Sequence, residues 1–232
     1  MSTNNVIEMK DAEVWKEIGI RSTDECNYTF AIEAFNKSIK LNPNDAYTYY
    51  CRGQAYSQLD KNKKALKDYN KSIKLDPEYA LAYHSRGFTY RKIGNFKKAI
   101  ENFSKIIEIH PRIAIPYNNR GIVYHKLGEH QKAIDDYSEA IRVKPTYVEA
   151  IYNRALAYIN LDQNELAIED FSRVISLKPD HAEAYHFRGI TYFLQGKNLL
   201  GYSDAKKAAA LGSSKFLEEA KQYGKPLIQN EQ

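Results

Sequence analysis

Arginine and aspartate recur in this 232-residue chain at an interval that could bring their side chains together. Arginines stand 34 residues apart at Arg52, Arg86, Arg120, Arg154 and Arg188. Sixteen residues after each comes a carboxylate or an amide, namely Asp68, Asn102, Asp136, Asp170 and Asp204. The planar guanidinium can donate two hydrogen bonds to one carboxylate, so the spacing predicts Arg–Asp pairs inside the fold. The alternative is an arginine ladder that binds phosphate or an acidic peptide.

The other residues that could do chemistry form no recognisable reactive site. His84, His125, His130, His181 and His186 follow no metal-ligand spacing, and His110 precedes a turn proline. Two cysteines, Cys26 and Cys51, are too few for a disulfide framework or a metal cluster. No glycine-rich phosphate loop is present. We therefore predict a protein that is not an enzyme and uses no metal and no cofactor.

The interval of 34 residues extends to the residues that must build the helices. Units begin at Ala12, Ala46, Ala80, Ala114, Val148 and Ala182, and a proline at position 32 closes the first five, at Pro43, Pro77, Pro111, Pro145 and Pro179. Positions 4, 8 and 11 share one face of a first helix, and positions 20, 24 and 27 share one face of a second. Small residues at positions 8 and 20 let the two helices approach, so the aromatic residues around them are predicted to be core.

This pattern resembles the tetratricopeptide repeat, W-x2-L-G-x2-Y…A-x3-F…P with a period of 34, over residues 12–213. The resemblance implies an all-α fold, a right-handed superhelical solenoid of antiparallel helix-turn-helix repeats. We expect repeats at 12–45, 46–79, 80–113, 114–147, 148–181 and 182–213, and a capping helix at about 214–224. Residues 1–11 and 225–232 are expected to be tails. The sixth unit departs from the pattern at Gly201, Ala205 and Ser213.

In the resembled family, ligands bind to the exposed side of the first helices, in a concave groove. Its positions are 2, 5, 6, 9, 12 and 13 of each unit, and many are apolar here. An exposed apolar surface of this kind usually marks a binding site. From positions 5, 6, 9 and 12 we predict partner-binding residues Tyr50, Gln54, His84, Phe88, Asn118, Asn119, Ile122, Tyr152, Asn153, Leu156, His186, Phe187, Ile190 and Phe193.

Two family binding modes can be compared with these residues. Asn119 and Asn153 share position 6 and could form two rungs of an asparagine ladder along a peptide backbone; the alternative is ordinary solvated surface. The carboxylate clamp for acidic chaperone tails needs Lys, Asn and Arg at fixed positions, where this chain has residues such as Phe88 and Glu149. The clamp is therefore absent.

The leading interpretation is a non-catalytic adaptor that binds a peptide segment or a partner protein in the groove. One alternative is self-association through the apolar end of the sixth unit. Another is RNA binding by Arg91, Lys92, Lys97 and Lys98, although these could equally be a solvated turn. The 34 basic and 29 acidic residues are interspersed, which does not favour nucleic acid.

The chain carries no apolar run of the roughly 18 to 20 residues that a membrane span needs. Its start, MSTNNVIEMK, lacks the apolar core of a signal peptide. We therefore expect no membrane partner and a cytoplasmic location.

Overall fold

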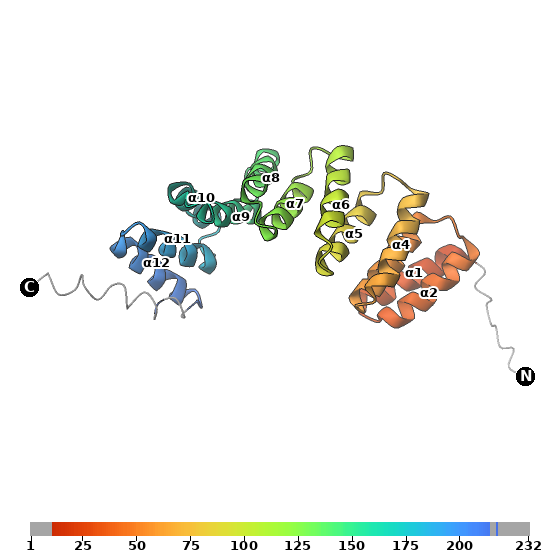
Figure 1. The fold of residues 1–232 in the computed structure, drawn as a ribbon. Helices are drawn as coiled ribbons and strands as arrows, with labels where there is room; N and C mark the ends of the chain where they lie inside the picture. Colours follow the sequence, from red (N-terminus) through yellow and green to blue (C-terminus); the bar gives the residue numbers. More distant parts are fainter. Residues whose placement is uncertain (1–10, 214–216, 218–232) are drawn as a thin grey trace, which may run out of the picture. The chain divides into compact units, whose positions relative to one another are not determined.

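The computed structural model describes residues 11–213 and Leu217, and the described residues form twelve α-helices. The chain divides into two compact units between Pro111 and Arg112. Each unit holds six helices, arranged as three antiparallel hairpins (Figure 1). The predicted all-α repeat fold is thus confirmed.

The hairpins begin and end close to the predicted repeat boundaries. The first unit contains α1 (Ala12–Asp24), α2 (Tyr28–Leu41), α3 (Ala46–Gln58), α4 (Asn62–Leu75), α5 (Ala80–Lys92) and α6 (Phe96–Ile109). The second contains α7 (Ala114–Lys126), α8 (His130–Val143), α9 (Val148–Ile159), α10 (Asn164–Leu177), α11 (Ala182–Leu194) and α12 (Asn198–Ala210). Odd-numbered helices are the first helices of the hairpins. Within each unit, consecutive first helices contact one another.

Proline ends the second helices as the sequence predicts. The helix α2 stops at Leu41, and Asn42, which precedes Pro43, is extended at φ −131° and ψ 92°. The same geometry is found at Asp76 before Pro77 and at Lys144 before Pro145. A proline ring clashes with a helical residue before it, so this conformation follows directly from the sequence.

The turn inside each hairpin depends on one residue with a positive φ at position 15. Glycine supplies it at Gly94, Gly128 and Gly196, where φ is 71° to 77°. Cys26, Asp60 and Asp162 adopt φ of 56° to 59° at the equivalent positions. Aspartate tolerates this conformation better than most residues, whereas cysteine does so rarely.

Close approach of the two helices explains the glycine at position 8. A Cβ added to Gly121 would lie 2.7 Å from Cε1 of Tyr137, and one added to Gly53 would lie equally close to Tyr69. The aromatic residues at position 24 are almost completely buried: Phe35, Tyr69, Phe103, Tyr137 and Phe171. These rings are core, as predicted.

The sixth repeat forms its hairpin despite its departures from the pattern. Phe193 packs against Gly201, and Ala205 is fully buried beside Ile190, Phe193 and Leu217. The predicted tails lie outside the described residues apart from Asp11, and so does the predicted capping helix apart from Leu217.

Candidate functional site: the first-helix face

The recurring arginines are paired, and the pairs lie inside single hairpins. Nε and Nη2 of Arg154 donate to the two carboxylate oxygens of Asp170 at 2.7 and 2.8 Å. The same two-bond geometry joins Arg52 to Asp68, Arg120 to Asp136, and Arg188 to Asp204. Asp170 raises the pKa of Arg154 by more than burial lowers it. The predicted Arg–Asp pairing is confirmed.

In Arg52, Arg154 and Arg188 the third guanidinium nitrogen reaches the preceding repeat. Nη1 of Arg154 donates to Oγ of Ser138 at 3.0 Å, and Nη1 of Arg188 donates to Oγ of Ser172 at 2.9 Å. In the first unit, Arg52 reaches Asn36 in the same way at 2.7 Å. Each of these arginines therefore holds its own hairpin and fastens it to the hairpin before it.

Arg86 is the exception because its partner is an amide. Its Nε donates to Oδ1 of Asn102 at 2.8 Å, and its Nη1 donates to Asn70 at 2.7 Å. Burial lowers the pKa of Arg86, in contrast to the four arginines that face a carboxylate. A neutral partner satisfies hydrogen bonds but leaves the desolvated charge uncompensated.

A second set of contacts joins position 5 of one repeat to position 6 of the next. Nδ2 of Asn153 donates to Oδ1 of Asn118 at 3.0 Å, and a hydrogen bond links Tyr50 to Ser85. The rings of Tyr152 and Phe187 meet edge to face with centroids 6.1 Å apart. Positions 5 and 6 therefore connect neighbouring first helices.

These contacts correct the expectation that every predicted residue lies on an exposed face. Tyr50, Asn118 and Asn119 are buried. Asn118 bonds both Asn153 and Tyr147, and Tyr50 packs against Tyr69 and Tyr79 and accepts a hydrogen bond from Gln54. The two amides of the expected ladder are thus either buried or engaged with a neighbouring helix.

The remaining predicted residues keep part of their surface exposed. Half-buried side chains are found at Gln54, His84, Ile122, Tyr152, Asn153, Leu156, His186, Phe187, Ile190 and Phe193. Tyr152 and Phe187 belong to an aromatic cluster with Phe171 and His181. Burial raises the pKa of Tyr152 to about 12, and the charge of Glu183 adds to the rise.

Phe88 is the predicted residue that stays exposed, and the structure adds three others at position 2. Phe88 is 36% exposed on α5, Leu81 on the same helix 52%, Tyr47 on α3 41%, and Ile115 on α7 49%. Leu81 and Phe88 are seven residues apart, so they share one side of α5. Sequence reasoning placed position 2 in the groove but chose no site residue from it. The sequence signal that was available is the large apolar residue at position 2 in three successive repeats.

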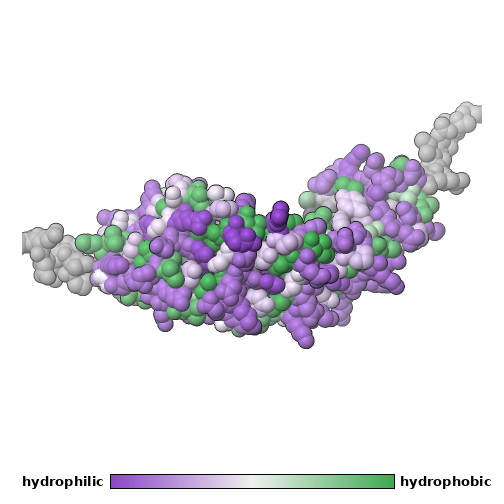
Figure 2. All heavy atoms as spheres, turned by 90° about the horizontal axis from the view of Figure 1, so that it is seen from above, coloured by the Kyte–Doolittle hydropathy of each residue, from purple (hydrophilic) through white to green (hydrophobic). Residues whose placement is uncertain are grey.

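We call Tyr47, Leu81 and Phe88 the first-helix patch; all three lie in the first unit. The ring centroid of Phe88 lies 4.8 Å from that of His84 and 6.1 Å from that of Phe103. The guanidinium of Arg91 lies 4.3 Å from the centroid of Phe88. Tyr47 stacks on Tyr50. These contacts fix the rings, so a ligand would meet a largely preformed apolar surface. Figure 2 shows hydrophobic and hydrophilic residues interspersed over one face of the molecule.

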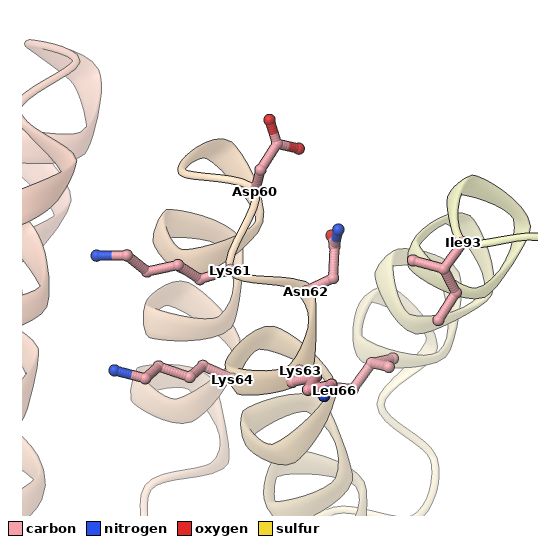
Figure 3. Close-up of a pocket in the computed structure, with 7 residues that line it drawn as sticks. All are labelled: Asp60, Lys61, Asn62, Lys63, Lys64, Leu66 and Ile93. Atoms are coloured by element: carbon pink, nitrogen blue, oxygen red, sulfur yellow. The ribbon is translucent and has the colours of Figure 1, made fainter.

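A surface depression of about 580 Å³ lies away from the predicted groove residues. It is lined by Asp60, Lys61, Asn62, Lys63, Lys64, Leu66 and Ile93. Leu66 and Ile93 form its apolar wall between two neighbouring hairpins, while Lys61 and Lys64 extend away from Ile93 (Figure 3). It shares no residue with the predicted site and remains a competing place for a ligand.

The basic cluster considered for RNA is partly used inside the molecule. Lys92 pairs with Asp60, Arg91 lies over Phe88, and Lys98 lies 5.2 Å from the ring of Tyr90. In residues 11–213, no group of three or more histidines, cysteines or carboxylates gathers as metal ligands. None of the described helices is long and apolar enough to cross a membrane.

Comparisons with known proteins identify the repeat. The family model "Tetratricopeptide repeat" matches residues 80–113, 114–147 and 148–181, and the related model "TPR repeat" matches residues 27–60 and 53–94. Together they span residues 27–181. Comparison with curated proteins gives no match.

Several solved structures share the fold. The C-terminal part of a TPR repeat-containing protein from Cytophaga hutchinsonii is 22% identical with a TM-score of 0.80, covering 93% of this chain and 89% of that one. YrrB, described as a TPR protein with an unusual peptide-binding site, is 25% identical with a TM-score of 0.69, covering 82% and 99%. A MamA protein is 28% identical with a TM-score of 0.66, covering 72% and 97%.

Proposed function

Because the chain belongs to the tetratricopeptide repeat family, we propose that it is a non-catalytic protein-interaction scaffold that holds a peptide segment of a partner protein. The proposed site is the exposed side of α3 and α5 in the first unit, centred on the first-helix patch. The observation that carries the proposal is the exposure of Leu81 and Phe88 on one side of α5, together with that of Tyr47 on α3, the neighbouring first helix. Apolar side chains of this size are exposed at a free-energy cost, which a ligand can remove.

The chemistry of this surface favours a peptide with apolar anchors. Burying one Leu- or Phe-sized side chain contributes about 1.5–3 kcal/mol. Two or three such anchors, less the cost of association, correspond to a dissociation constant in the micromolar range. The carboxylate clamp is absent from the sequence, so recognition through an acidic chain terminus is not part of the proposal.

A display library of random peptides tests the proposal, because it samples many combinations of apolar anchors at once. Peptides selected on the wild-type protein are measured against the double variant Leu81→Asp, Phe88→Asp. Two single variants serve as controls: Leu41→Asp changes an exposed leucine on α2, and Ile93→Asp changes the wall of the depression. We expect at least about tenfold weaker binding by the double variant alone. Unchanged binding by it would overturn the proposed site, and a loss confined to Ile93→Asp would move the site to the depression.

Self-association is the second candidate function, favoured by three exposed leucines in the sixth repeat. Leu194, Leu199 and Leu200 are exposed at the turn between α11 and α12, and Leu199 reaches 74%. Earlier repeats carry polar or charged residues at the position of Leu199, namely Thr29, Lys63, Lys97, Gln131 and Glu165. Sedimentation equilibrium distinguishes the outcomes. A dimer that dissociates on Leu199→Lys, Leu200→Lys supports this function, and a monomer at high protein concentration removes it.

A further inference from the structure

Two histidines of the fourth repeat face each other across the turn of their hairpin. His125 lies in the last turn of α7, and His130 is the first residue of α8. Their Nδ1 atoms are 3.3 Å apart, and their ring centroids are 4.9 Å apart at an interplanar angle of 66°. Both side chains are half-buried. The turn brings them together because Gly128 adopts φ of 77° and reverses the chain.

The separation of the two nitrogens has a chemical meaning. Zinc binds imidazole nitrogen at about 2.0–2.1 Å with tetrahedral geometry, which places two such ligands about 3.3–3.4 Å apart. The two Nδ1 atoms already stand at that distance, and each has a lone pair for a metal when its ring carries the proton on Nε2. A shared N–H···N hydrogen bond between two neutral rings is the alternative use of the same geometry.

We propose that His125 and His130 form a two-imidazole binding site for a divalent transition-metal cation of the zinc and copper class. Imidazole is a preferred ligand of these ions, and water or a ligand from a bound partner would complete the coordination. The site does not depend on the peptide-binding function proposed above. It lies in the second unit, whereas the first-helix patch lies in the first.

Comparison between the repeats shows that neither imidazole is needed to build a hairpin. At the position of His125 the other repeats carry Thr23, Ser57, Arg91, Ile159 and Phe193. At the position of His130 they carry Tyr28, Asn62, Phe96, Asn164 and Asn198. The fourth repeat is the one of the six with histidine at both positions, which is what a site specific to this turn would require.

Neutral imidazole is the form that ligates metals, so the proposed site requires both rings to be neutral. Glu129 lies between the two histidines in the sequence, and its carboxylate pairs with Lys132.

Matched variants can be taken from the sister repeats, which makes them compatible with folding. His125→Ser introduces the residue of the second repeat, and His130→Asn introduces the residue of the second, fifth and sixth. His110→Asn is the control, because His110 is an exposed histidine in the linker after α6. Circular dichroism verifies that all three variants keep their helices.

Titration calorimetry with zinc chloride and with copper chloride, on protein without a histidine tag, tests the proposal. Wild type and His110→Asn should bind one cation per chain with a micromolar dissociation constant. Changes outside the first ligand shell already cost about 10–100-fold in metal affinity, so His125→Ser and His130→Asn should each lose at least that much. Equal binding by wild type and these two variants would overturn the proposal, and so would the absence of binding by wild type at millimolar cation.

Discussion

Arg154 and Asp170 are joined by two parallel hydrogen bonds across the fifth hairpin, and Arg154 also reaches Ser138 of the fourth. The carboxylate of Asp170 is almost fully buried, with its side chain 7% exposed. A buried carboxylate that keeps its partner is tolerated, whereas one that loses its partner is strongly destabilising. Arg154 therefore stabilises its own hairpin and joins it to the hairpin before it.

Arg154→Leu should lower the free energy of unfolding by about 3 kcal/mol, because it leaves the charge of Asp170 buried and unpaired. The double variant Arg154→Leu, Asp170→Leu should recover much of this loss. Arg142→Leu is the matched control, since Arg142 makes an exposed ion pair with Glu139 and should cost less than about 1 kcal/mol. Urea unfolding measures all three. An unchanged midpoint for Arg154→Leu together with lost peptide binding would instead support a ligand-binding arginine ladder.

Asn153→Ala should reduce stability by about 1–2 kcal/mol without weakening peptide binding. The substitution removes the donor that satisfies the buried amide oxygen of Asn118. Unfolding by urea gives the first quantity, and the affinity of a library-selected peptide gives the second. The opposite result, weaker binding at unchanged stability, would restore the asparagine ladder that the sequence suggested.

Gly121→Ala should destabilise the fourth hairpin even though alanine is the better helix former. The new methyl group would lie 2.7 Å from the ring of Tyr137, which is only 1% exposed. Overpacking of this kind costs about 1–3 kcal/mol, and the gain in helix propensity returns about 1 kcal/mol. A rise in melting temperature would show that the ring can move aside. Ala155→Gly is the reverse control, at the same position of the fifth repeat.

The two cysteines should differ strongly in reactivity. Burial raises the pKa of the Cys51 thiol to about 11, mainly by desolvation, whereas Cys26 is exposed. At pH 8 about one Cys51 in a thousand is then a thiolate, the reactive form. We expect one fast-reacting thiol per native chain, which Cys26→Ser removes and Cys51→Ser does not. The rate at Cys51 should rise about tenfold per pH unit up to its pKa. Equal rates for both cysteines at pH 8 would contradict this account.

The sequence predicts contacts well where the two partners repeat together. Arg154 and Asp170 are such a pair, because the first repeat, which lacks the arginine, also lacks the carboxylate and has Ile18 and Ala34 instead. The helix boundaries follow from proline chemistry at fixed positions, and the aromatic core follows from the spacing of small residues. All of these depend on interactions inside one repeat.

Contacts between repeats were missed because no common residue type marks them. Positions 5 and 6 are linked by Asn118 with Asn153, by Tyr50 with Ser85 and by the rings of Tyr152 and Phe187. Three different kinds of interaction join the same two positions. Which side chains meet there depends on how far neighbouring first helices are displaced along each other. The exposure of individual groove residues depends on the same displacement, so Phe88 and Asn118 could not be distinguished from the sequence.

The central claim is that the exposed side of α3 and α5 holds a peptide, and photo-crosslinking tests it most directly. A benzophenone amino acid is placed at Phe88, on the first-helix patch, or at Leu41, on α2, and irradiated with a library-selected peptide. Our account predicts a crosslinked product from position 88 and none from position 41. Crosslinking at position 41 with none at position 88 would contradict it.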